Sequence, residues 1–173
     1  MFLPVYNHQW QMNFKFVLSF YINMSRKKER RSYCPIGYVL DIVGDKWTLL
    51  IIRDILLFGK RTYGEFANSD EKIATNILAD RLAILEEEGI VIKEKDTEKG
   101  SRYIYSITPK GKDLIPMMIE MLKWSATYDT DTRVPAMMVE KAKDDRERFI
   151  KDILEGLERN EFLLARRSDQ TVI

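Results

Sequence analysis

Hydrophobic positions along the chain first follow a helical period, then alternate briefly, and then return to a helical period. The first apolar helix is predicted to begin at Cys34-Pro35 and to end at Gly44, because proline favours the first helical position and glycine the end. Asp45 can cap the next helix, predicted over 46–57. That segment, DKWTLLIIRDIL, is nearly all apolar but too short to cross a bilayer. It predicts a buried helix, with Arg53 and Asp54 as an edge or dimer-interface pair; alternatively, Arg53 reaches a phosphate.

A helix-turn-helix pattern follows. YGEFANS, residues 63–69, predicts one or two helical turns, and residues 69–73 predict a polar turn. The next helix is expected over about 74–88, because Leu78, Leu82 and Leu85 recur at helical spacing and mark one buried face.

The period then switches to that of a β-hairpin. Two short β-type runs within 91–107 flank the polar turn 96–100. A helix is predicted from Pro109 to about Tyr128 with a kink at Pro116, and another over about 137–164. This order is typical of a winged helix-turn-helix: mainly α with a small β-hairpin wing (α+β), dimerising through terminal helices.

Four segments are predicted along the chain: an N-terminal arm 1–33, a DNA-binding domain 34–108, a helical dimerisation region 109–166 and a frayed tail 167–173. Residues 1–23 are aromatic-rich and nearly uncharged and make a poor signal peptide. We expect Met24 to be the native start; the alternative is an arm that packs on a partner. Basic residues at 26–31 form either a solvated arm or one that contacts phosphates.

Composition excludes several kinds of site. The 173 residues contain one cysteine and one histidine, too few for a structural zinc site or an intrachain disulfide. A reducing cytoplasmic setting is therefore expected. No glycine-rich phosphate loop or Ser/His pair is present, so we predict no catalysis, no cofactor, no metal and no membrane partner. The net charge of +1 leaves nucleic-acid binding to local patches.

Several segments resemble a known family. CPIGYVLDIVGDKWTLLIIRDIL, RTYGEF, LADRLAILEEEGIV and YSITPKGKDLIPMM are similar to the HxlR-type transcriptional regulators, relatives of the MarR group, over about residues 34–125. The resemblance implies a homodimeric winged-helix protein that binds double-stranded DNA and responds to a metabolite or an electrophile. It places polar groove-facing residues at Thr75, Asn76, Asp80 and Arg81. Family members commonly carry a serine cap where this chain has Ala74.

The predicted function is a homodimeric repressor on a pseudo-palindromic operator, with helix 74–88 in the major groove and wing 91–107 on the backbone or minor groove. The cationic residues expected on phosphates are Lys60, Arg61, Lys72, Lys95, Lys99 and Arg102. Two alternatives stay open: a protein-interaction module that binds no DNA, and a regulator gated by a reversible ligand with an inert Cys34.

Cys34 and a set of methionine and aromatic residues each have two possible roles. Cys34 is either a structural thiol or a redox sensor, because a helix N-terminus and nearby arginines favour the thiolate and some family members sense quinones, aldehydes or disulfide stress at this position. A second group is either dimer core or an adaptable effector pocket. Its members are Met117, Met118, Met121, Trp124 and Tyr128.

Overall fold

The computed structural model describes residues 33–98, 100–132 and 134–164 of a chain that divides into two units, 1–38 and 39–173. In the first unit, the described residues contain the start of helix α2 (Pro35–Val43). The predicted basic arm and the predicted non-native segment 1–23 lie outside the described residues, as does the predicted tail 167–173.

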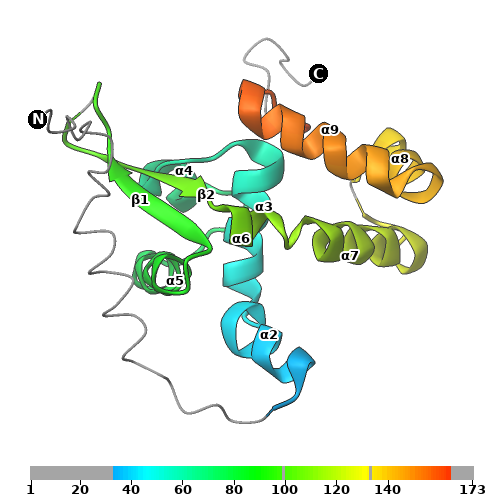
Figure 1. Ribbon diagram of the computed structural model, residues 1–173, viewed down its shortest axis with the longest axis horizontal. Coiled ribbons are helices and arrows are strands. Elements are labelled where there is room, and N and C mark those ends of the chain that lie inside the picture. The colour runs from blue at the N-terminus through cyan, green and yellow to red at the C-terminus, as the bar shows by residue number, and fades with distance from the viewer. Residues whose placement is uncertain (1–32, 99, 133, 165–173) are drawn as a thin grey trace, which may run out of the picture. The chain divides into compact units, whose positions relative to one another are not determined.

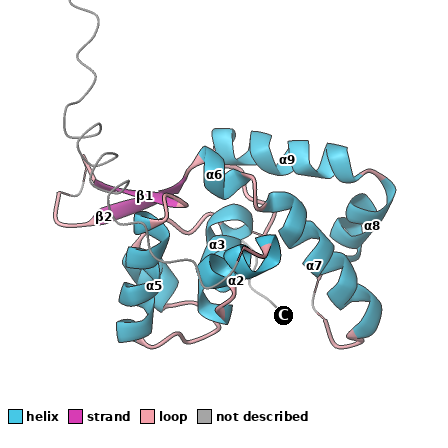
Figure 2. Cartoon of the chain, turned by 60° about the horizontal axis from the view of Figure 1, so that its bottom comes forward, coloured by secondary structure: helices cyan, strands magenta, loops and turns pink. Residues whose placement is uncertain are grey.

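The second unit is mainly helical with one β-hairpin, as predicted (Figure 1). Helix α3 lies at its centre, with α5 and the hairpin on one side and α7 and α9 on the other (Figure 2). Its elements are α3 (Lys46–Phe58), α4 (Tyr63–Ala67), α5 (Thr75–Glu87), β1 (Val91–Lys95), β2 (Tyr103–Ile107), α6 (Pro109–Lys112), α7 (Ile115–Tyr128), α8 (Ala136–Asp144) and α9 (Arg146–Arg159).

Helix α3 has the sharp ends that the sequence predicts. The Asp45 side chain accepts hydrogen bonds from the backbone N–H of Trp47 (2.9 Å) and of Thr48 (3.3 Å), which satisfies donors of the first turn. Gly59 ends the helix in the left-handed region, with φ of 69°. Between these caps, Ile52 is fully buried, and the prediction of a buried central helix is confirmed.

The wing is an antiparallel hairpin. Its register pairs Val91 with Ile107 and Lys95 with Tyr103. Thr62 makes an isolated bridge to Ile104, which attaches the start of α4 to the hairpin. Together with α4, the turn and α5, this hairpin completes a winged helix-turn-helix.

The prediction of two long helices after the wing is wrong, because each of these segments forms two shorter helices. The helix expected from Pro109 to Tyr128 stops at Lys112, and Pro116 lies in the first turn of α7 instead of kinking one helix. Proline starts a helix well, since its missing N–H is needed only inside one. The helix expected over 137–164 breaks at Asp145, whose side chain accepts from the Arg148 N–H (2.9 Å) and caps α9.

Helices α8 and α9 belong to the hydrophobic core. Met138, Phe149 and Ile153 are buried against residues of α3 and α7, and a small apolar void of about 20 Å³ remains among them. Among the residues that the structure describes, no helix is long and apolar enough to cross a membrane. No group of three His, Cys, Asp or Glu residues in the same part of the chain is placed to hold a metal ion.

Candidate nucleic-acid interface

Helix α5 divides into a buried face and an exposed one. Leu78, Leu82 and Leu85 are at most 2% exposed and pack into the core, as their spacing predicts. Thr75 and Asn76 are exposed in the first turn, and Asn76 points away from the leucine face. The helix therefore presents polar side chains, backed by a rigid apolar face, at its N-terminal end.

The N-terminus of α5 has no side-chain cap. Ala74 occupies the cap position and makes no such hydrogen bond, and Thr75 is the first helical residue. The hydroxyl of Tyr63 donates to the Thr75 carbonyl oxygen (2.8 Å), so that α4 holds this end of α5 from the side. Within the described part of the chain, the first-turn N–H groups of α5 have no side-chain acceptor, which makes this end suited to an external anion such as a phosphate.

Arg81 and Asp80 differ in their surroundings. The Arg81 Nε lies 3.1 Å from the Asp45 carboxylate, and its Nη1 lies 3.3 Å from Asp80. Asp45 is the N-cap of α3, so Arg81 ties the middle of α5 to the start of α3. Asp80 is exposed on the outer face of α5. Of the four residues that the family resemblance assigns to base reading, Thr75, Asn76 and Asp80 are exposed and Arg81 is half-buried.

The wing carries cations on a braced scaffold. Lys95 and Arg102 are exposed at the far end of the hairpin, and Lys99 lies outside the described residues. The Arg102 guanidinium forms an ion pair with Asp96, whose side chain is buried. The Arg102 side chain is still 45% exposed. The ion pair therefore fixes the base of the hairpin tip, while the guanidinium stays accessible to solvent.

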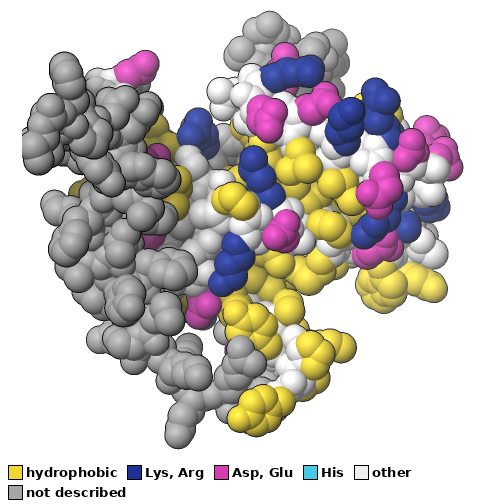
Figure 3. All heavy atoms as spheres, viewed as in Figure 1, with side chains coloured by type: hydrophobic (Ala, Val, Ile, Leu, Met, Phe, Trp, Pro, Cys, Tyr) yellow, Lys and Arg dark blue, Asp and Glu magenta, His cyan; other side chains and the backbone are white. Residues whose placement is uncertain are grey.

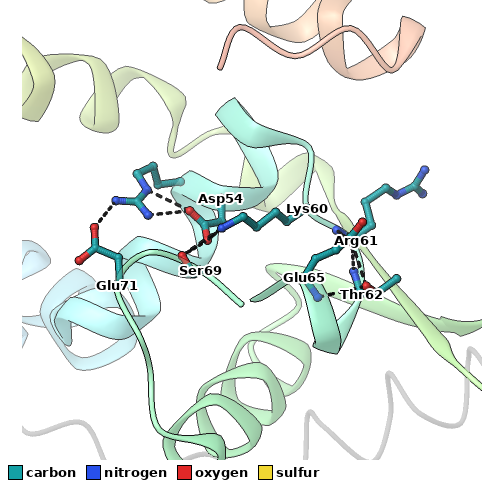
Figure 4. Close-up of polar contacts among 8 residues, drawn as sticks. Asp54, Lys60, Arg61, Thr62, Glu65, Ser69 and Glu71 are labelled. Carbon is teal, nitrogen blue, oxygen red and sulfur yellow. Dashed lines mark hydrogen bonds and ion pairs between the residues drawn. The ribbon is translucent and has the colours of Figure 1, made fainter. Parts of the chain in front are cut away.

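Asp54 is the centre of a polar network that the sequence did not predict (Figure 4). Its side chain is 4% exposed and accepts from Lys60 Nζ (2.7 Å), Ser69 Oγ (3.0 Å) and both Nε (3.0 Å) and Nη2 (2.7 Å) of Arg53. Arg53 also bonds Glu71 (2.8 Å). The network joins α3 to the turn that precedes α5.

In the structure the Arg53–Asp54 pair forms an internal support between α3 and the turn before α5, while its place at a dimer interface stays a prediction. Burial acts to lower the pKa of Arg53, but the hydrogen bonds to Glu71 and Asp54 outweigh it and raise that pKa. A sequence signal existed: Asp54 falls next to Ile55 on the buried side of the helix, where a charge requires a partner.

The cations expected on phosphates lie in different places. Lys60 directs its ammonium group into the Asp54 network, between a carboxylate and the Ser69 hydroxyl. Arg61 is exposed, and its Nη2 donates to Ser106 Oγ (2.8 Å) on β2. Lys72 is exposed in the turn before α5, with φ of 51°. Only Lys72 and the wing cations therefore lie on elements that flank the exposed face of α5.

Glu65 secures the start of α4. Its carboxylate accepts from the backbone N–H of Arg61 (2.8 Å) and of Thr62 (2.7 Å), and the Thr62 hydroxyl in turn accepts from the Glu65 N–H, forming a capping box. Burial acts to raise the pKa of Glu65, but these hydrogen bonds outweigh it and hold the pKa below its ordinary value.

Cys34 lies at the start of α2. Its thiol is exposed, and its Sγ accepts a weak hydrogen bond from the Gly37 N–H at 3.4 Å. This is the position of a helix N-cap, where the backbone dipole favours negative charge.

The five residues predicted as dimer core or effector pocket are divided between two faces of α7. Met118 lines the internal void, whereas Met121, Trp124 and Tyr128 are 45%, 67% and 70% exposed. The rings of Trp124 and Tyr128 lie 5.1 Å apart. Met117 is half-buried and shares the helical spacing of the exposed residues. The structure therefore forms an apolar stripe at these four positions and no single pocket.

Comparison with known proteins gives consistent matches. The family model described as HxlR-like helix-turn-helix matches residues 42–133, more than half of the chain. The uncharacterised HTH-type transcriptional regulator sll1512 of Synechocystis is 34% identical over 95 residues, which cover 55% of this chain and 70% of that protein. A second such regulator, YdeP of Bacillus subtilis, is 32% identical over 95 residues, covering 55% and 73%.

Solved structures agree with these matches. The crystal structure of PA1607, a candidate transcription factor, gives a TM-score of 0.53 at 34% identity and covers 61% of this chain and 72% of that one. A candidate MarR-family transcriptional regulator from Porphyromonas gingivalis W83 gives 0.51 at 32% identity, covering 56% and 94%. Helices α8 and α9 lie beyond the residues matched by the family model.

Proposed function

The chain belongs to the HxlR-like helix-turn-helix family, and we propose that it is a homodimeric transcriptional repressor that inserts α5 into the major groove of an operator. The observation that carries this proposal is the exposed, uncapped N-terminal end of α5, which is braced by α3 and α4. Recognition helices read bases through their N-terminal residues, and a free helix N-terminus attracts phosphate.

Individual roles follow from the surroundings of each side chain. Thr75 and Asn76 are the base-reading candidates, and the Asp80 carboxylate can accept from a cytosine amino group. We assign Arg81 to positioning α5, because Asp45 holds its guanidinium. Phosphate contacts fall to exposed cations on the turn before α5 and on the wing, together with Lys99, which lies outside the described residues; Lys60 and Arg61 are omitted. That set is Lys72, Lys95, Lys99 and Arg102.

The apolar stripe of α7 is the proposed dimer contact. Exposed aromatic and methionine side chains that gather on one helix face mark association surfaces in otherwise polar proteins. A second copy packed on Met121, Trp124 and Tyr128 would remove them from water. A twofold dimer would place two α5 helices at half-sites about one helical turn apart.

Fluorescence anisotropy with the DNA upstream of the protein's own gene tests the DNA-binding role. Asn76→Ala should weaken that site by about 1–3 kcal/mol and leave random DNA within about twofold. Glu87→Ala, at the exposed far end of the same helix, is the matched control and should bind both DNAs like the wild type. Absence of binding to any DNA at low salt would favour the alternative, a winged-helix protein-interaction module.

Cys34 is the proposed point of regulation. Its exposed Sγ, bonded by a helix N–H, has the setting of a thiol that reacts with electrophiles. Treatment with benzoquinone should release the wild type from its operator and leave Cys34→Ser bound. Release of both proteins alike would point instead to a reversible ligand and an inert Cys34.

A further inference from the structure

A surface cleft of about 180 Å³ lies between strand β2 of the wing and the end of α9. Its remaining walls come from α3, α6 and the segment that follows α9. In Figure 3, Lys and Arg side chains border hydrophobic ones between β2, α6 and the C-terminal end of α9. The volume is well above the roughly 10–15 Å³ that one water molecule needs.

The far wall of the cleft is held by the backbone. After α9, Asn160 takes a left-handed conformation (φ 56°) and turns the chain back toward α3. The Leu164 N–H then donates to the Leu57 carbonyl oxygen at 2.9 Å. The Phe162 ring lies against Gly59 so closely that a Cβ there would be 2.2 Å from it. The wall is therefore a folded part of the protein.

The interior of the cleft is apolar with cations at its side. Leu157 and Phe162 supply apolar surface opposite Ile107, while Arg61 and Lys112 supply positive charge. The Arg61 backbone is fixed on both sides, because its N–H donates to Glu65 and its carbonyl accepts from the Tyr105 N–H (2.7 Å). The bond from Nη2 to Ser106 Oγ then sets the direction of its guanidinium.

These two cations have no ion pair among the described residues, although all four cations on α9 do. Lys112 is half-buried at the end of α6, where the close approach of Gly111 to Ile90 and Ile107 fixes the helix. Glu158 also lines the cleft and contributes the one carboxylate among its described lining residues, which leaves a net positive charge.

We propose that this cleft binds a small organic monoanion, a carboxylate with an aromatic or short alkyl body. The carboxylate would pair with Arg61, which is exposed, and with Lys112, which is half-buried, since hydrogen bonds between charged partners are stronger than neutral ones. The apolar body would cover Leu157 and Phe162. A second negative charge would be repelled by Glu158. Arg61 and Lys112 lie within the family match, whereas the wall formed by α9 and the following segment lies beyond it.

Occupancy would reach the wing directly. Ser106 and Ile107 belong to β2, so a bound anion joins the C-terminal segment to the strand that supports the hairpin tip. This regulatory consequence rests on the proposed DNA-binding function, whereas the binding itself does not.

Isothermal titration calorimetry of the full chain tests the site with benzoate and hexanoate as probes. At least one of them should bind with a dissociation constant at or below about 1 mM. The neutral isostere benzamide should bind about tenfold more weakly than benzoate, and the cation benzylamine should not bind. Equal binding of benzoate and benzamide, or no binding of either carboxylate, would overturn the proposal.

Lys112→Gln locates the site. It should weaken carboxylate binding about tenfold while the melting temperature stays unchanged. Lys143→Gln, at an exposed position of α8, is the matched control and should bind like the wild type. Amide shifts in ¹H–¹⁵N spectra should fall on Ser106, Ile107 and Asn160; shifts confined to Met121, Trp124 and Tyr128 would overturn the assignment. Carboxylate binding by a protein that binds no DNA would separate this site from the proposed function.

Discussion

Helices α5 and α9 have nearly the same length, 13 and 14 residues, and pack on α3 from two sides. Both present a strictly buried face. Leu78 and Leu82 of α5 are 0% and 2% exposed, and Phe149 and Ile153 of α9 are 1% and 4% exposed. As supports of the core, the two helices are equivalent.

Their outer faces differ. Helix α9 has Asp145 as its N-cap, Asn160 as its C-cap, and ion pairs such as Arg148–Asp152 at 3.2 Å along its length. Helix α5 has an alanine cap, and in the described part of the chain no ion pair joins residues four apart within it. A structural helix satisfies its own polar groups, whereas one that binds a partner leaves them open. The difference separates helices that look alike in the core.

The largest expected effect tests the feature that α5 and α9 share, their buried apolar faces. Phe149→Ala removes a ring that is 1% exposed, and should lower the free energy of unfolding by about 3–5 kcal/mol, as Leu82→Ala should by about 2–5 kcal/mol. Urea denaturation measures both. A loss below about 1 kcal/mol for Phe149→Ala would show that α9 does not pack on the core as α5 does.

The next effect tests how α5 is supported from α3. Asp54→Ala leaves Arg53 and Lys60 without their carboxylate and should cost about 2–4 kcal/mol, less than a fully buried pair because both cations reach water. Glu71→Ala, which removes only the exposed end of the network, should cost under about 0.5 kcal/mol. Equal losses in urea denaturation would contradict a network centred on Asp54.

Adding a side-chain cap to α5 and removing the one at α9 should change stability in opposite directions. Ala74→Ser supplies the missing acceptor at α5 and should stabilise the protein by about 1 kcal/mol, while Asp145→Ala should destabilise it by a similar amount. Thermal unfolding at one pH measures both changes. An unchanged melting temperature for Ala74→Ser would mean that the end of α5 is already satisfied.

The smallest effect concerns the charged face of α9. The hydrogen bond from Lys141 is the main cause that lowers the pKa of Asp152; burial opposes it and Arg148 adds to it. The carboxylate therefore contributes stability above its unfolded pKa of about 3.9, and loses it as the pH falls through the folded value. Asp152→Asn should cost a few tenths of a kcal/mol near neutral pH and nothing at the acid end. A cost that does not vary with pH would contradict an ionic contribution.

Much of this fold could be predicted from local patterns. Leucine spacing gave the buried face of α5, and Asp45 and Gly59 gave the ends of α3, because caps and helical periods act within a few residues. The divided helices after the wing show the limit of that approach. A proline such as Pro116 can start a helix or kink one, and an aspartate such as Asp145 can cap a helix or lie on its exposed face. Packing decides between these outcomes.

The candidate site was less predictable, because the direction of a side chain depends on distant partners. Lys60 and Arg61 are neighbours of similar charge, yet one turns into the Asp54 network and the other toward Ser106. Arg81 is drawn to Asp45, which lies far away in sequence. The cleft beside Lys112 exists only because the segment after α9 folds back, and no local pattern indicated that fold.

The contact between Arg81 and Asp45 also gives this protein a built-in optical probe. Asp45 caps α3 by accepting from the backbone of Trp47, an indole that is half-buried with Lys46 4.6 Å from its ring. Arg81 of α5 thus forms an ion pair with the residue that precedes α3, two positions before this fluorophore. In a variant in which Trp10 and Trp124 are both replaced by phenylalanine, the emission of Trp47 is therefore placed to report, without any attached dye, when the outer face of α5 is engaged.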